Sequence, residues 1–363
     1  MSSETPKLQG YNVATNQHSI SGLSSGAYMA VQLHLAHSSH FVGLGIIAGG
    51  PYRCVESFRD AANIAEDAYA LNAIYICMTP LTAQTGPRAK RLADLARQTA
   101  AAGKIDPIEN LAGDRLYIFT GALDPVVNSL VVRSTRDFYL DLGVPAAQIK
   151  FIDTVPAGHS IITDNIEDSP LAATQPPYIN NGGFMQSHDI LRHIYGDLKP
   201  PFPYPTGQLI RFKQSEFINR DASFASMAEF GYVYVPRAVQ QGETARGVHI
   251  ALHGSQQGYN YVNLVGGLPD TAFQPAFGNR YMTTTGYNQI ADSNNLIVLY
   301  PQAAADDGNQ AQNPEGSWDW WGYSSPNPEH PDYYSKDAVQ IRAIYNMLEQ
   351  LCSGRPSTAV TKS

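Results

Sequence analysis

A glycine-serine motif near the N-terminus constrains this chain more than any other feature of its sequence. Gly22-Leu23-Ser24-Ser25-Gly26 matches the pattern G-x-S-x-G, and it stands between a strand-like run and a helix-length amphipathic stretch. The glycines allow a sharp strand-to-helix turn, which would raise the Ser24 hydroxyl above a sheet and aim the Ser25 amide at a developing oxyanion. The alternative is a glycine-serine turn that only connects two elements.

Short apolar or aromatic runs alternate with helix-length stretches along the chain, which predicts an α/β protein with crossover connections. In the first half, strands are expected at Gln17 to Ser21, Phe41 to Ala48, Arg115 to Thr120 and Gln148 to Asp153, and helices at Ser25 to His37, Val127 to Leu142 and Ser187 to Leu198. In the second half, we expect an antiparallel edge pair at Gln208 to Lys213 and Phe230 to Pro236, strands at Gly247 to Leu252 and Asn295 to Tyr300, and helices at Tyr287 to Ser293 and Ser335 to Leu351. The long loop from Pro301 to Tyr334 is typical of a functional lid or wall. No repeat or linker interrupts the pattern, so a single domain over residues 1–363 is expected.

Composition and charge exclude several classes of partner. With 24 Lys and Arg against 32 Asp and Glu, the net charge is −8, which disfavours nucleic acid. The longest apolar run, Phe41 to Tyr52, is well short of the roughly 20 residues that span a bilayer, so no transmembrane helix and no membrane partner are expected. The first ten residues lack the features of a secretory signal, which fits either a cytoplasmic protein or a mature secreted or periplasmic form.

A nucleophilic serine near neutral pH needs a base, and the base needs an orienting carboxylate. Asp124 follows the strand-like run RLYIFT, and His159 follows QIKFIDTV. This gives the order Ser, Asp, His with each residue just past a strand end, as in α/β-hydrolases. The alternatives are a helix N-cap for Asp124 and an ordinary loop position for His159.

Other histidines are weaker candidates for the base than His159. His34, His37 and His40 are spaced so that they twist around a helix, which favours a packed or solvated helix face over a metal site. His253-Gly254 ends a strand and resembles the turn that lends a second oxyanion amide in this superfamily.

The His253-Gly254 turn comes at an unusual place in the chain order. In an ordinary α/β-hydrolase it precedes the serine motif, whereas here it follows His159 by nearly a hundred residues. We therefore expect a circularly permuted α/β-hydrolase fold. The elbow, Asp and His strands would lie in residues 11–198, and the oxyanion strand, aromatic loop and last helix in residues 205–352. Two domains that meet at one site are the alternative.

The motifs together resemble a known family. The segments that carry the resemblance are SISGLSSGAYMA, GIIAGGPYRC, GALDPVV, PAGHS, GYVYVP, HIALHGSQQ, NLIVLYPQA and SWDWWGY. In this order, and over about residues 11 to 352, they are similar to the circularly permuted, fungal-type poly(3-hydroxybutyrate) depolymerases, relatives of feruloyl-esterase-like hydrolases. The resemblance implies a secreted serine hydrolase that cleaves short-chain polyhydroxyalkanoate esters.

The resemblance also implies roles for individual residues. Ser24, Asp124 and His159 would form the triad, the amides of Ser25 and Ser255 would hold the oxyanion, and Trp318 would stack on the polymer. The family usually has cysteines where this chain has Ser255 and Ser317, so one family disulfide is absent. The other family-like pair, Cys54 and Cys77, is retained and favours an oxidising compartment.

Ester hydrolysis through an acyl-enzyme is therefore the leading hypothesis, with a polyester or oligoester as substrate and a monomer as the expected state. The reaction requires no metal and no organic cofactor. A feruloyl or acetyl-xylan esterase would use the same triad and is the alternative enzyme. An inactive hydrolase fold that serves as a binding module is the non-enzymatic alternative.

Overall fold

The computed structural model describes residues 5–58, 68–220, 222–262, 264–265, 268–269, 278–305 and 313–354. Its strands are β1 His18–Leu23, β2 Phe41–Ile47, β3 Arg115–Phe119, β4 Ile149–Ile152, β5 Ile161–Thr163, β6 Ser169–Pro170, β7 Ile179–Asn181, β8 Gln208–Lys213, β9 Phe230–Val235, β10 Gly247–Leu252, β11 Leu264–Val265, β12 Leu268–Pro269 and β13 Leu296–Tyr300. Its α-helices are α1 Ser25–Ala36, α2 Ala68–Tyr75, α3 Ala89–Ala101, α4 Ser129–Asp141, α5 Gln186–Tyr195, α6 Ala222–Ala225, α7 Arg237–Gln240, α8 Arg280–Thr284, α9 Tyr287–Asn294 and α10 Val339–Leu351.

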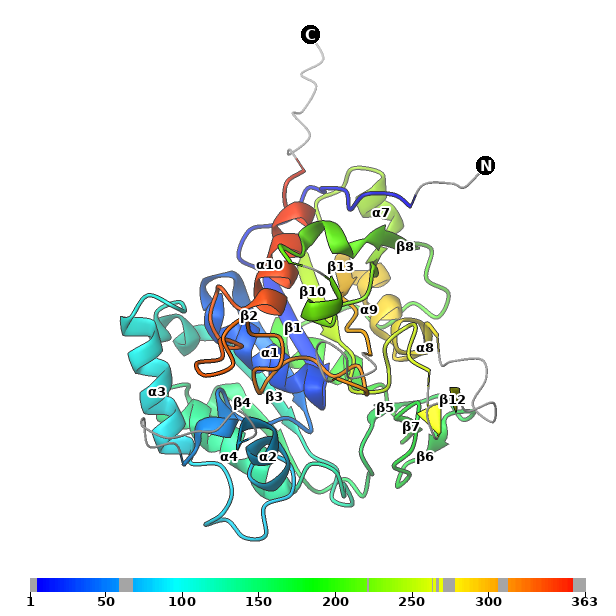
Figure 1. Ribbon diagram of the computed structural model, residues 1–363. Coiled ribbons are helices and arrows are strands. Elements are labelled where there is room, and N and C mark those ends of the chain that lie inside the picture. The colour runs from blue at the N-terminus through cyan, green and yellow to red at the C-terminus, as the bar shows by residue number, and fades with distance from the viewer. Residues whose placement is uncertain are drawn as a thin grey trace.

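An eight-stranded sheet runs through the molecule in the order β4-β3-β2-β1-β10-β13-β9-β8. The strands from β4 to β13 are parallel, and β9 runs antiparallel to both β13 and β8. The predicted α/β class and the predicted antiparallel edge pair are therefore confirmed. Early and late parts of the chain share this sheet, because β1 pairs directly with β10 (Figure 1).

Helices cover both faces of the sheet. On β2, Ile46 lies beside Ala27 of α1, whereas its neighbour Gly45 faces Ile190 of α5. Successive side chains of a strand point to opposite faces, so α1 and α5 lie on opposite sides. Helix α10 packs beside α1, and α9 packs on β13 and β9 (Figure 1). The large apolar core fills the space between these layers and the sheet.

A buried polar cluster joins β1 to β10. The two ring nitrogens of His249 on β10 lie 2.7 Å from Ser19 Oγ and 2.8 Å from Ser21 Oγ on β1. The Ser21 hydroxyl also hydrogen-bonds Tyr287 of α9 at 2.6 Å. Burial lowers the pKa of His249 to about 3, so the ring stays neutral. Every polar group here has a partner, as buried polar groups require.

The register between β1 and β10 pairs Gly22 with Leu252. Because parallel strands end at the same edge of a sheet, Ser24 and the turn His253-Gly254 emerge side by side. A small parallel sheet, β5-β7-β6, follows His159 in the chain.

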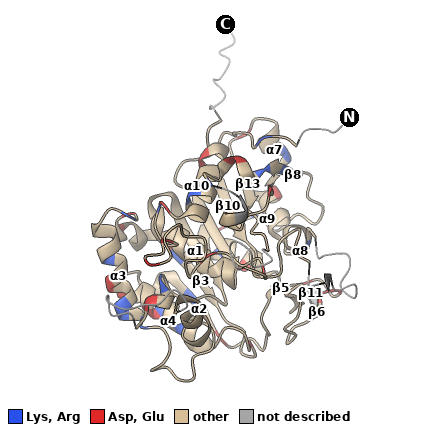
Figure 2. Cartoon of the chain, in the orientation of Figure 1, with Lys and Arg blue, Asp and Glu red and all other residues tan. Residues whose placement is uncertain are grey.

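Among the described residues, none of the helices is long and apolar enough to cross a bilayer. Lys and Arg residues are interspersed with Asp residues on α3 and α4, so these helices do not present a face of one sign (Figure 2).

Candidate active site

Ser24 occupies the turn between β1 and α1 in a strained conformation. Its φ of 55° and ψ of −124° are unfavourable for a residue with a side chain. The Ser24 amide donates to Ile47 O at 2.9 Å, which ties the turn to the end of β2. Strain that is held by surrounding contacts is typical of a nucleophile elbow.

The two glycines of the motif are required by close backbone contacts. A Cβ on Gly22 would lie 2.2 Å from Gly26 O, and a Cβ on Gly26 would lie 2.3 Å from His253 O. Both distances are far below van der Waals contact, and both obstacles are backbone atoms. The glycines therefore let the start of α1 approach the His253-Gly254 turn, which brings the amides of both segments near Ser24.

Asp124 and His159 form a buried pair. Asp124 Oδ2 lies 2.7 Å from His159 Nδ1. The other carboxylate oxygen, Oδ1, accepts the amides of Val126 at 2.8 Å and Val127 at 3.0 Å. With Nδ1–H donating to the carboxylate, His159 Nε2 is left as a proton acceptor, the tautomer a general base requires. Asp124 thus does cap the following turn, and it does so while holding the histidine.

Ser24 and His159 line the same small pocket, which has a volume of about 70 Å³. Its apolar lining residues, which we call the apolar wall, are Leu23, Met78 and Val126. Its other lining residues besides Ser24 and His159, which we call the polar wall, are Tyr178, Gly254, Ser255, Gln256, Gln257 and Glu315. The structure therefore gathers Ser24, His159 and Ser255 around one cavity, with Asp124 directly behind the histidine. A hydroxyl, an imidazole and an oriented carboxylate in this arrangement can perform nucleophilic attack on an ester carbonyl.

The amides expected to hold an oxyanion come from two segments. Ser25 is the first residue of α1, so its amide has no acceptor within the helix. On the other segment, the Gly254 amide is taken by Gln257 Oε1 at 2.6 Å, which leaves the next amide, that of Ser255. In the part of the chain that the structure describes, no hydrogen bond occupies the amide of Ser25 or of Ser255.

The side chains of His253 and Gln257 fix that turn. His253 Nε2 accepts the Ala303 amide at 3.1 Å, and Nδ1 donates to Gly254 O at 2.7 Å. Burial lowers the pKa of His253 to about 4, which keeps this neutral arrangement. Gln257 also donates to Pro177 O at 2.6 Å and so joins the turn to the segment that follows His159. The role of Gln257 was not anticipated from the sequence; its only signal was its place in the loop directly after His253-Gly254.

Ser255 and Ser317, expected at the sites of a lost disulfide, are in direct contact. Their Oγ atoms lie 2.6 Å apart, and Ser255 also donates to Ser25 Oγ at 3.3 Å. The two side chains therefore point at each other, as a disulfide requires.

Replacing both Ser255 and Ser317 with cysteine is expected to produce a disulfide spontaneously. The two residues are 62 positions apart, so closing this loop should stabilise the fold by about 2 to 4 kcal/mol. Thiol titration and thermal melting of the oxidised double variant test this, with each single cysteine variant as the control. Two reactive thiols and an unchanged melting temperature would contradict it.

The prediction that Trp318 stacks on a polymer is wrong for this structure. The residue is fully buried at 0% exposure, its Nε1 donates to His253 O at 3.0 Å, and its ring packs against the His253 ring. Trp318 therefore packs against the His253-Gly254 turn and offers no ring face to solvent. Trp320, which is also buried, stacks on Tyr28 of α1.

Trp318→Ala should consequently lower the free energy of unfolding by about 3 to 5 kcal/mol, the usual cost of emptying a buried tryptophan site. Chemical denaturation measures this, and Trp321→Ala at a partly buried site is the control with a smaller expected loss. A stable Trp318→Ala protein that fails only on long substrates would restore the stacking role.

The structure joins Cys54 and Cys77 by a disulfide, with a Cα–Cα distance of 5.9 Å. The hydroxyl of Tyr28 on α1 donates to Cys77 O. Met78, the next residue, lines the pocket, so the disulfide and Tyr28 together anchor the segment that forms the apolar wall.

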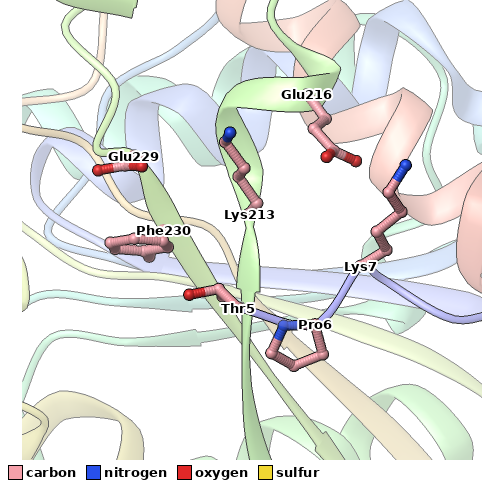
Figure 3. A pocket seen from close by; sticks show the side chains of 7 residues that line it. All are labelled: Thr5, Pro6, Lys7, Lys213, Glu216, Glu229 and Phe230. Carbon is pink, nitrogen blue, oxygen red and sulfur yellow. The ribbon is translucent and has the colours of Figure 1, made fainter. Parts of the chain in front are cut away.

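Among the described residues, the histidine cluster of residues 34–40 does not form a comparable site. His34 is buried and contacts Asp114 at 2.9 Å and Tyr139 at 3.1 Å, while His37 stacks on Tyr345, so these histidines pack within the fold. A larger hollow of about 340 Å³ lies beside β8 and the N-terminal segment (Figure 3). Lysine and glutamate side chains alternate around it, and its described lining residues include no serine, cysteine or histidine.

Comparisons with known proteins identify relatives over nearly the whole chain. The sequence matches none of the protein-family models. It is 35% identical over 355 residues to the poly(3-hydroxybutyrate) depolymerase of Delftia acidovorans, covering 97% of this chain and 63% of that protein. It is 31% identical over 360 residues to the polyhydroxybutyrate depolymerase of Talaromyces funiculosus, covering 96% of this chain and 93% of that protein.

A solved structure is also similar. The crystal structure of the PHB depolymerase from Penicillium funiculosum matches with a TM-score of 0.76 at 30% identity, over 96% of this chain and 99% of that one. A second match of the same extent is a serine-to-alanine PHB depolymerase complexed with an R3HB trimer. The chain thus spans almost all of the fungal relatives and less than two thirds of the bacterial one.

Proposed function

The chain belongs to the polyhydroxybutyrate depolymerase family, and from this premise we propose that it hydrolyses poly(3-hydroxybutyrate) or its oligomers as a serine esterase. The observation that carries the proposal is the arrangement of Ser24 and His159 around one pocket, with Asp124 bonded to the histidine. The names of the relatives indicate the substrate, and the complex of one relative with an R3HB trimer supports oligomers as ligands.

The proposed reaction proceeds in two steps. His159 Nε2 takes the Ser24 proton as the hydroxyl attacks the ester carbonyl, and the amides of Ser25 and Ser255 stabilise the negative charge on the carbonyl oxygen. The protonated imidazole, stabilised by Asp124, then gives its proton to the departing alcohol oxygen. In the second step, His159 activates a water that releases the acyl group from Ser24.

Exposed apolar side chains near the apolar wall support a polyester substrate. The segment leading to Met78 carries Tyr75 at 64% exposure, and Leu81 follows it at 93%. Leu123, immediately before Asp124, is 55% exposed. The Asn128 amide donates to Met78 O at 2.8 Å, which ties this segment to the loop after Asp124. Contact between such side chains and a solid polyester would be favourable, because both are apolar.

We propose a single catalytic domain with a permuted element order. It is supported by the pairing of β1 with β10 and by the hydrogen bond from the Tyr11 amide to Leu351 O, which places the early chain beside the end of the last helix.

Secretion or a periplasmic location is supported by the Cys54–Cys77 disulfide, since such bonds persist in oxidising compartments.

Clearing of a polyhydroxybutyrate suspension, with the soluble products resolved by length, tests the proposal. The wild-type protein should clear the suspension and release hydroxybutyrate oligomers, and methyl ferulate should be a far poorer substrate. Rapid hydrolysis of methyl ferulate without clearing and without cleavage of soluble hydroxybutyrate oligomers would favour the feruloyl-esterase alternative. Failure to react with a fluorophosphonate would favour the inactive binding module.

A further inference from the structure

The polar wall of the active-site pocket is held together by a bridge that ends in a carboxylate. Tyr178 Oη donates to Gln256 Oε1 at 3.0 Å, and Gln256 Nε2 donates to Glu315 Oε1 at 3.4 Å. The main-chain amide of Gln256 also donates to Glu315 O at 2.8 Å. Both the main chain and the side chain of Gln256 therefore hold Glu315 in place. The Tyr178 ring meets the His159 ring edge-on, with centroids 5.9 Å apart. The bridge therefore runs from the catalytic histidine to Glu315.

Glu315 gives this pocket a negative charge. Among the described residues that line it, Glu315 is the sole acidic side chain, and none is Lys or Arg. Burial, together with the Glu315 charge, raises the pKa of Tyr178 to about 12, so the tyrosine is neutral at ordinary pH. Glu315 is exposed to solvent and lines the pocket, so its carboxylate can meet a substrate that enters.

The two ends of a 3-hydroxybutyrate oligomer differ in charge. One end is a neutral hydroxyl, and the other is a carboxylate. If the scissile bond is the ester nearest the acid end, the free carboxylate lies within one monomer unit of Ser24 and enters the pocket. If another ester is cut, the carboxylate stays farther away and is better screened by water.

We propose that Glu315 is a specificity-determining residue: its carboxylate disfavours a free substrate carboxylate in the pocket and so directs cleavage of oligomers away from their acid end. This assignment rests on the proposed ester hydrolysis. It follows from like-charge repulsion across a pocket whose described lining residues include no Lys or Arg to offset it. Capping the acid end as a methyl ester removes the charge and therefore removes the bias.

A hydroxybutyrate trimer with a ¹³C label in its acid-terminal unit tests the proposal. Either cut releases one monomer and one dimer, and the label shows which end the monomer came from. At initial rates, Glu315→Gln should raise the ratio of labelled to unlabelled monomer by roughly two- to fivefold, the size expected for one exposed charge at short range. Glu315→Asp, which keeps the charge, should retain a ratio close to that of the wild type.

Three controls sharpen this experiment. Glu109→Gln removes an exposed acid that borders a different hollow and should leave the ratio unchanged. The methyl ester of the labelled trimer should give the same ratio of cuts with the wild type and with Glu315→Gln. Raising the salt concentration should shift the wild-type ratio toward that of Glu315→Gln, because salt screens exposed charges.

Active variants with identical label ratios would reject the role of Glu315 and leave ester hydrolysis intact. No cleavage of the trimer by any of these proteins, wild type included, would reject the hydrolysis of oligomers and the assignment with it.

Discussion

Ser24→Ala is expected to reduce kcat for ester hydrolysis by roughly four to six orders of magnitude while the protein remains folded. The variant removes the only atom that forms the acyl bond, and the remaining oxyanion donors cannot replace that step. Loss of one hydroxyl at the turn leaves the backbone contacts of Gly22 and Gly26 in place. Initial rates on a nitrophenyl ester and on a hydroxybutyrate trimer measure the effect, and thermal melting checks the fold.

A second serine provides the matched control for Ser24. Ser187 on α5 is buried, and its hydroxyl has no hydrogen-bond partner in the described structure. Ser187→Ala should therefore keep near-normal turnover, and fluorophosphonate should label it as it labels the wild type. A folded Ser24→Ala protein with near-normal esterase activity would overturn the assignment of the nucleophile.

Asp124→Asn should lower kcat by about three to four orders of magnitude, because it reverses the tautomer of His159. The Asn Oδ1 can keep the two hydrogen bonds from the amides of Val126 and Val127. The side-chain NH₂ must then face His159 Nδ1 and donate to it. The proton of the neutral ring moves to Nε2, which can no longer accept the proton of Ser24. Steady-state rates together with ¹⁵N chemical shifts of the histidine ring measure both effects.

The fold should survive this substitution, since the turn keeps its amide bonds. Asp153→Asn is the matched control: this carboxylate pairs with Arg133 at a partly exposed site and should change turnover little. An Asp124→Asn protein that is folded and retains most of its activity would show that another group orients the histidine.

Local sequence patterns predicted most of the regular structure. The bounds of β8 and β10 agree with the expected ones, because alternating or continuous apolar runs with clear turn signals define a strand locally. The last helix was expected from Ser335 but begins at Val339. Ser335 instead donates to Asp332 Oδ2 and accepts the Asp337 amide, so these polar side chains form a turn that delays the helix. Helices α2 and α3 were not anticipated.

The two errors at the site have a common cause. A tryptophan in a loop can either pack in the core or bind a substrate, and its apolar character fits both roles. Trp318 packs in the core because its Nε1 donates to His253 O, 65 residues away in the chain. Gln257 was missed because its role depends on Pro177, 80 residues earlier in the chain. No local pattern records such contacts, and each is made only when distant segments fold together.

The sequence by itself determined the α/β class, the turn that carries Ser24, and the position of Asp124 and His159 after strands, because these depend on short-range spacing and backbone preference. The tertiary structure alone decided which strands are neighbours, which amides remain free beside Ser24, and that Glu315 and Met78 line the same pocket. The physical reason is that pocket walls are built from hydrogen bonds and packing between residues far apart in the chain, whose energies are realised only in the folded protein.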